Sequence, residues 1–152
     1  MDMTLMVKEL RDDEGEKLAS YIDTEDYWTI GVGHLIDPKR GANPAPFGID
    51  LRGGKTITAD QSAYLLEQDI NSKMAQLDAQ LPWWRSLSEV RQRVIVNMAF
   101  NLGVIGLMGF KNMLAAAQSG NYALAAAAMK ASRWASQVGA RADRLAAMMV
   151  AG

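Results

Sequence analysis

The sequence predicts an α+β fold that is mainly helical. Three observations support this prediction. Apolar residues recur at helical spacing over most of the chain, two capping signatures mark helix starts, and residues 18–32 are instead rich in aromatic and β-branched residues. With 152 residues, of which 49% are hydrophobic, the chain is long enough to bury a core.

The composition excludes several classes of function. There is no cysteine, so neither a disulfide nor a catalytic thiol is available. The formal net charge of −1 argues against a strongly basic nucleic-acid-binding protein. A single histidine leaves no cluster with metal-ligand spacing, so we expect no metal and no other cofactor. We expect no signal peptide and no transmembrane segment, because no apolar run approaches the roughly 20 residues of a membrane span.

The first predicted helix ends near Gly15, a residue that readily takes the left-handed conformation after a helix. Before it, apolar residues fall on one helical face at Met3, Met6, Val7 and Leu10. Glu14 is therefore expected in the last turn of this helix.

A β-hairpin is predicted next, with strands at 18–22 and 27–32 and a tight turn at 24–26. Residues 37–54 contain three of the four prolines. We expect a long surface loop there, and we place a short third strand within it.

The rest of the chain is predicted to be helical. Thr58 and Gln61 form a capping box that opens a long helix over about 58–80. Ser86 and Glu89 form a second capping box before an apolar segment at 94–100, which we expect to be the central core helix, ending at Gly103. Shorter helices are expected at about 104–108, 110–118, 122–132 and 140–150.

The candidate chemistry lies in the hairpin and just before it. Two carboxylates, Glu14 and Asp23, bracket its first half, and Thr29 lies in its second strand. Two carboxylates on neighbouring rigid elements are what acid-assisted cleavage of a glycosidic bond requires. Each residue also has an ordinary structural explanation: a surface glutamate, a turn aspartate and a strand threonine.

The spacing of these three residues closely resembles that of the phage-type lysozymes, a glycoside hydrolase family. Asp23 follows Glu14 by nine residues, and Thr29 follows by six more. Later stretches also resemble family motifs, namely 91–103, 109–112 and 132–134, so the resemblance covers about residues 5–150. One departure is Asp26, where the family usually has glycine in the hairpin turn.

The resemblance implies a single lysozyme-like domain over residues 1–152. It has an N-terminal lobe with a small antiparallel sheet at about 14–57 and a linking helix at about 58–80. A helical lobe at about 81–152 includes the N-terminal helix, and the substrate cleft lies between the lobes. Glu14 is then the general acid, Asp23 lies across the scissile bond, and Thr29 positions the attacking water. An inverting reaction is implied.

Further residues follow from the same resemblance. Leu35 and Phe100 match positions that touch the sugar polymer, although both are equally natural core residues. Arg141 matches an arginine that approaches the acid, with a solvated surface arginine as the alternative. His34 is expected to pair with Asp69 for stability rather than to shuttle protons.

The function implied is hydrolysis of peptidoglycan by a phage endolysin. The bond would be the β-1,4 link between N-acetylmuramic acid and N-acetylglucosamine. We expect a monomer that accumulates in the host cytoplasm and reaches the periplasm and wall through a holin-type lesion, without stable membrane insertion. The alternatives are a lytic transglycosylase and a non-catalytic peptidoglycan-binding module on the same scaffold.

Overall fold

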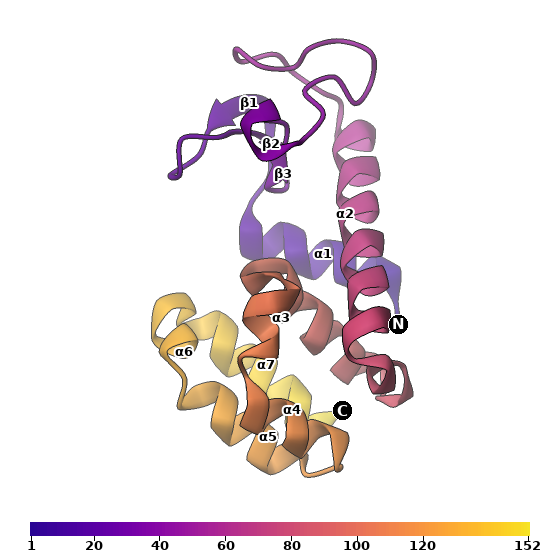
Figure 1. The fold of residues 1–152 in the computed structure, drawn as a ribbon, viewed down its shortest axis with the longest axis vertical. Helices are drawn as coiled ribbons and strands as arrows, with labels where there is room; N and C mark the ends of the chain where they lie inside the picture. Colours follow the sequence, from indigo (N-terminus) through magenta and orange to yellow (C-terminus); the bar gives the residue numbers. More distant parts are fainter. The chain divides into compact units, whose positions relative to one another are not determined.

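The computed structural model describes all residues, Met1–Gly152, and confirms a mainly helical α+β fold with one small sheet (Figure 1). The α-helices are α1 Met3–Glu14, α2 Ala59–Gln80, α3 Glu89–Met108, α4 Lys111–Gln118, α5 Tyr122–Lys130, α6 Arg133–Val138 and α7 Ala140–Ala151. The strands are β1 Lys17–Ile22, β2 Trp28–Gly31 and β3 His34–Leu35, and two 3₁₀ turns are η1 Pro38–Arg40 and η2 Pro82–Ser86.

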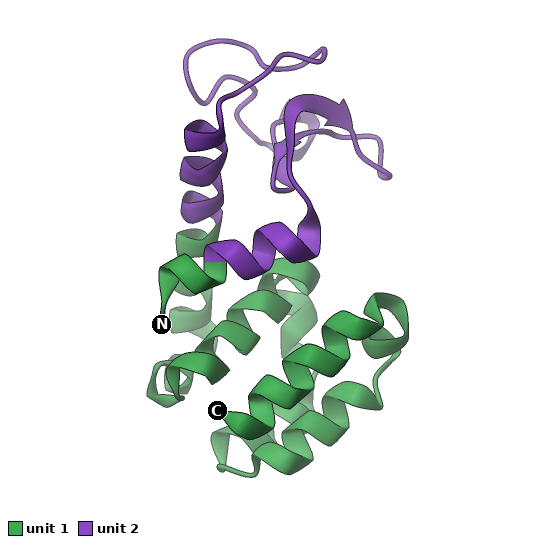
Figure 2. Ribbon diagram, turned by 180° about the vertical axis from the view of Figure 1, so that it is seen from behind, with its two compact units in different colours: residues 1–6, 70–152 green, residues 7–69 purple.

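The chain separates into two compact units, coloured differently in Figure 2. Unit 1 comprises residues 1–6 and 70–152, and unit 2 comprises residues 7–69. Both boundaries fall inside helices, one in α1 and one in α2. Unit 2 therefore contains the end of α1, the whole sheet and the first half of α2.

The sheet of unit 2 is antiparallel with the order β1-β2-β3. The two strands of the hairpin lie where the sequence predicts them, and Tyr21 is paired with Thr29. The predicted place of the third strand is wrong. The third strand, β3, lies before the 37–54 loop, because the chain turns back at residues 32–33 and His34 pairs with Ile30 of β2 directly after that turn.

The 37–54 loop is anchored to the sheet by one buried serine. Ser20 Oγ donates to the carbonyl oxygen of Leu51 at 2.6 Å and accepts from the N–H of Gly54 at 2.9 Å. Beneath the sheet lies a core of buried aliphatic residues, with Trp28 and Phe47 packed against it: Ile30, Ile36, Leu51, Ile57 and Leu65. This core and the serine clamp support the hairpin from one side.

Helix α2 begins at the predicted capping box. Gln61 N–H donates to Thr58 Oγ1 at 3.1 Å, and Thr58 N–H donates to Gln61 Oε1 at 2.9 Å. The second predicted cap is shifted by two residues, since Ser88 and not Ser86 caps α3. Residues 82–86 form η2, in which the Ser86 hydroxyl donates to the carbonyl oxygen of Trp83.

Unit 1 is built around α3, which packs on α7, while α5 packs on both α4 and α7. The predicted end of the core helix at Gly103 is a kink, where φ is 74° and ψ is 158°, and a further helical turn follows it to Met108. No single helix is long and apolar enough to cross a membrane; only α3 and α4 reach that length and apolarity together, as a pair bent by 103°.

Asp37 generates a prediction about stability and pH. Its side chain is 2% exposed and accepts N–H groups of Trp28 at 3.1 Å and Lys39 at 2.9 Å. Burial raises the pKa of Asp37, but these hydrogen bonds, with the nearby cations Lys39 and Arg52, outweigh it and leave the pKa lowered. A lowered folded-state pKa contributes stability above the unfolded-state pKa, and that stability is lost as pH falls through the folded value.

We therefore expect Asp37→Asn to lower the midpoint of thermal unfolding at neutral pH, with the difference from wild type shrinking towards about pH 3. Circular dichroism melts of both proteins across this range measure it. Glu67→Gln, at an exposed carboxylate in the middle of α2, is the control. A difference that stays constant with pH would contradict the assignment.

Candidate active site

The three residues of the predicted catalytic motif all lie in unit 2. Glu14 is the last residue of α1 and is exposed, Asp23 follows β1, and Thr29 is in β2. Gly15 ends the helix as predicted, with φ of 75° and its N–H donating to the carbonyl oxygen of Arg11 at 3.0 Å. The chain can therefore turn from α1 into the sheet directly after the glutamate.

The Asp23 carboxylate has two oxygens in different environments. Oδ1 accepts the N–H groups of Glu25 and Tyr27, both at 2.9 Å, so it is fully engaged by the turn. Oδ2 lies 3.4 Å from the hydroxyl oxygen of Thr29. One oxygen is therefore held by the turn, while the other faces Thr29.

Thr29 is 4% exposed, and its hydroxyl has two neighbours. It lies 3.1 Å from the carbonyl oxygen of Tyr27 as well as 3.4 Å from Asp23 Oδ2. A hydroxyl carries one proton and two lone pairs, so Thr29 can donate to one of these oxygens and still accept from a water. Asp23 and Thr29 together are thus able to hold a water molecule.

The hairpin turn forms with aspartate at the position where the family that the sequence resembles usually has glycine. Asp26 has φ of 70°, the only positive φ outside glycine, and Asp tolerates this region better than most residues. Its N–H donates to the carbonyl oxygen of Asp23 at 3.1 Å, and its own carbonyl oxygen accepts from Lys39 Nζ at 3.3 Å. The turn therefore closes with aspartate at this position.

Tyr21 is a neighbour of the site that the sequence analysis did not single out. It is paired with Thr29 across the strands, so the two side chains project from the same face of the sheet. Burial raises the pKa of the Tyr21 hydroxyl, and the negative charges of Asp23 and Glu14 raise it further. Lys17 Nζ lies 4.2 Å from the centre of its ring. The sequence signal that points to Tyr21 is its place in the predicted strand next to Asp23, and the structure adds its pairing with Thr29.

Asp23→Asn is expected to lower the pKa of Tyr21, because one of the two charges that oppose formation of the phenolate is removed. Carbon-13 NMR of ring-labelled tyrosine over a pH titration measures this. Asp60→Asn serves as the control and should leave the pKa of Tyr21 where it is in wild type. An identical Tyr21 titration in Asp23→Asn would place the carboxylate too far away to act on the phenol.

His34 and Asp69 are brought together within unit 2. The Nδ1 atom of His34, in β3, lies 2.8 Å from Oδ2 of Asp69, in α2, and the two side chains are 20% and 29% exposed. The pair joins the third strand to the long helix. That the pair is structural rather than catalytic stays a prediction.

Replacing Asp69 by asparagine should weaken this contact and lower the free energy of unfolding by about 1–2 kcal/mol near neutral pH. Wall hydrolysis, the activity that the resemblance implies, should remain largely intact. Chemical denaturation and a lysis assay on the same preparations test both statements. Glu67→Gln, an exposed carboxylate on the same helix, is the matched control. Unchanged stability, or a large loss of hydrolysis in a folded Asp69→Asn protein, would contradict the structural role.

The residues predicted to contact the sugar polymer are distributed over both units. Leu35 is half-buried in β3 and paired with Thr29. Phe100 is half-buried in α3. Arg141, in α7, donates through Nε to the buried Asn97 Oδ1 at 3.0 Å, a partner that the sequence analysis did not identify. Their roles towards substrate stay predictions.

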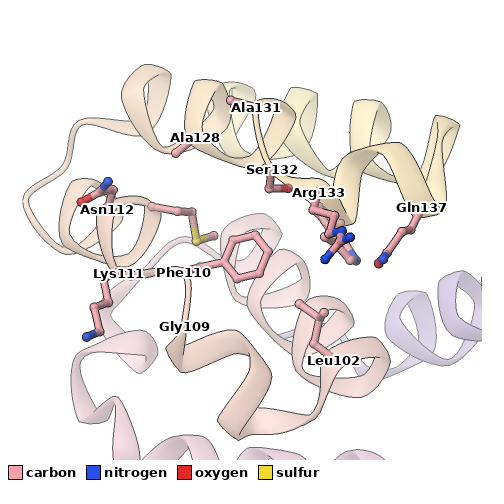
Figure 3. A pocket seen from close by; sticks show the side chains of 12 residues that line it. Leu102, Gly109, Phe110, Lys111, Asn112, Ala128, Ala131, Ser132, Arg133 and Gln137 are labelled. Carbon is pink, nitrogen blue, oxygen red and sulfur yellow. The ribbon is translucent and has the colours of Figure 1, made fainter.

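A pocket of about 750 Å³ lies in unit 1 between α4, α5 and α6. Figure 3 shows the ring of Phe110 pointing towards the space between Leu102 and Arg133. The polar lining of the pocket consists of lysine, asparagine, serine, arginine and glutamine side chains and the indole of Trp134. The indole N–H donates to Asn101. No carboxylate lines the pocket, so its lining lacks the groups that acid-assisted cleavage requires.

Comparison with known proteins gives one family and several relatives. The Phage lysozyme family matches residues 11–148. Probable T4-type lysozyme 1 of Dictyostelium discoideum is 32% identical over 164 residues, covering 97% of this chain and 96% of that protein. The pre-baseplate central spike protein Gp5 of Enterobacteria phage T4 is 33% identical over 97% of this chain, which spans 28% of the spike protein. The endolysin of Salmonella phage P22 is 36% identical over 66 residues, covering 42% of this chain and 38% of that protein.

Proposed function

The chain belongs to the phage lysozyme family and is a glycoside hydrolase of the muramidase type, and we propose that it cleaves the β-1,4 bond between N-acetylmuramic acid and N-acetylglucosamine in peptidoglycan. The observation that carries this proposal is the Asp23–Thr29 arrangement. One carboxylate oxygen faces a buried hydroxyl, and the other is held by the turn. An exposed glutamate at the end of α1 completes the set.

In the proposed reaction Glu14 is the general acid and protonates the oxygen of the leaving sugar. Asp23 Oδ2 and Thr29 Oγ1 hold the attacking water on the opposite face of the sugar ring. Asp23 draws a proton from that water while the water oxygen bonds to the anomeric carbon. Because water and not a carboxylate attacks, the reaction is inverting.

The hydrogen bonds of Asp23 support this division of roles. Asp23 Oδ1 already accepts two backbone N–H groups, so the carboxylate cannot rotate without breaking the turn. A carboxylate that is fixed in this way suits the orientation of a water better than the formation of a covalent bond to sugar. Glu14 is exposed and ends a helix just before a glycine, a position from which a general acid can reach the leaving sugar.

Glu14→Gln is expected to reduce hydrolysis by about 10²–10⁴-fold, because glutamine cannot donate the proton that a general acid supplies. Loss of turbidity of permeabilised Gram-negative cells measures the activity. Glu67→Gln, which removes an exposed carboxylate from α2, is the control and should clear the cells like wild type. If wild type fails to clear them, or Glu14→Gln clears them equally well, the proposal fails.

The products distinguish hydrolysis from the transglycosylase alternative. Hydrolysis leaves a reducing muramic acid end, whereas internal attack by the sugar gives an anhydro end about 18 Da lighter, because no water is added. Mass spectrometry of the released fragments decides between them. The Asp23–Thr29 pair favours the hydrolytic product, since a reaction without water needs no groups to hold it. A binding module without activity would release no fragments at all.

We propose that the protein acts as a monomeric endolysin, which accumulates in the host cytoplasm and reaches the wall through a holin-type lesion. Similarity to the endolysin of phage P22 supports this setting. The match to the spike protein of phage T4 favours a second setting, in which the same hydrolase is part of a virion. Proteomics of purified particles separates the two, because an endolysin is absent from them.

A further inference from the structure

Glu16 makes a set of contacts that the catalytic scheme does not use. Its Oε2 atom accepts from Arg11 Nε at 3.0 Å and from Ser62 Oγ at 3.0 Å. The Glu16 side chain is 22% exposed, and Ser62 is fully buried. A single carboxylate oxygen therefore connects the last turns of α1, the chain before β1 and the first turns of α2, all within unit 2.

These contacts hold the backbone on both sides of Glu14. Arg11 precedes Glu14 by three residues, and Glu16 follows Glu14 by two. Between them, Gly15 N–H donates to the carbonyl oxygen of Arg11, which closes the helix end. Glu14 thus lies in a short segment, residues 11–16, that is closed by the ion pair of Arg11 with Glu16 and by the backbone hydrogen bond of Gly15 to Arg11.

The same network reaches the strand that carries Thr29. Ser62 Oγ, which donates to Glu16, lies 3.0 Å from the position that a β-carbon on Gly31 would occupy. Gly31 is the last residue of β2, two residues after Thr29. The hydroxyl is therefore packed directly against the backbone of β2, where only a glycine leaves room for it.

We propose that Glu16 is a positioning residue for the hydrolysis, which fixes the acid Glu14 relative to the water-holding pair Asp23 and Thr29. The inference rests on the proposed function of these three residues. Glu16 acts through Arg11 on the end of α1 and through Ser62 on β2. It does not touch the reacting atoms.

Two physical arguments favour a catalytic consequence over a purely structural one. Ion pairs with a partly exposed member such as Arg11 contribute little to stability, so the loss of this one should not unfold the protein. Catalysis is far more sensitive to position, because a displacement of about 1 Å in the site can reduce the rate by about 10²-fold. A small shift of α1 against β2 would therefore change the rate before it changes the fold.

Glu16→Ala and Ser62→Ala are each expected to lower kcat by about 10–100-fold with KM within about twofold of wild type, because sugar binding is retained while the acid is displaced from the water. The double variant should lose little more than either single variant, since both remove one network. Glu16→Gln keeps an oxygen that accepts from Ser62 and should recover most of the rate. Kinetics on soluble peptidoglycan fragments, at a temperature where every variant is folded, measure these values.

Glu67→Gln is the matched control and should behave like wild type. Backbone amide chemical shifts give a second measurement, in which Ser62→Ala should move the resonances of Glu14 as well as those of β2. Unchanged kcat in folded Glu16→Ala, a rise in KM at constant kcat, or fully additive losses would each overturn the inference. Inactive wild type would instead contradict the proposed hydrolase function, so the two failures are distinguishable.

Discussion

The two backbone hydrogen bonds accepted by Asp23 Oδ1 are the constraint on which the hairpin of unit 2 depends. They allow the chain to reverse between β1 and β2 although Asp26 occupies the left-handed region, where an L-residue is disfavoured. They also orient the second carboxylate oxygen towards Thr29. The turn and the proposed water-holding pair are thus two results of one side chain, which couples the folding of the hairpin to the chemistry proposed for it.

Other contacts within unit 2 hold this hairpin in place. The aliphatic core beneath the sheet, the Ser20 clamp on the loop and the contact between His34 and Asp69 each connect a strand to a different part of the unit. None of these contacts uses Glu14, Asp23 or Thr29. These three supporting contacts therefore involve residues other than the proposed reacting groups, which is the arrangement expected where reacting groups must be held by side chains that are themselves locked in place.

Local signals in the sequence predicted the elements whose causes are local. The helix stop at Gly15, the capping box at Thr58 and the strands on either side of residues 24–26 depend on residues close together in the chain, and the structure has them as expected. The position predicted for the third strand is wrong because this strand has only two residues, which pair with β2 as soon as the chain has turned at 32–33. A strand of two residues has no periodicity that a sequence could reveal. The capping-box pattern favours Ser86, because Glu89 follows it by three residues, whereas Arg91 stands at that distance from Ser88. In the structure residues 82–86 form a 3₁₀ turn, so α3 begins later and Ser88 caps it.

The candidate site divides in the same way. Glu14, Asp23 and Thr29 were recognisable by spacing, and their catalytic roles stay predictions. The residues themselves gave no signal for two contacts over long separations: Glu16 meets Ser62 across 46 positions, and Arg141 meets Asn97 across 44. The contact of His34 with Asp69, 35 positions apart, was expected from the family resemblance alone. Glutamates near helix ends and serines in helices are common, so neither residue type alone indicates the other. Only the folded chain brings them together.

The close approach of Ser62 to Gly31 also limits how this protein can vary. A side chain at position 31 is disfavoured on two independent grounds, because φ is positive at 66° and the serine oxygen would lie 3.0 Å from the β-carbon. Position 62 has a single steric limit and should accept alanine but not a larger residue. In a library randomised at both positions, folded clones should therefore retain glycine at the first and small residues at the second.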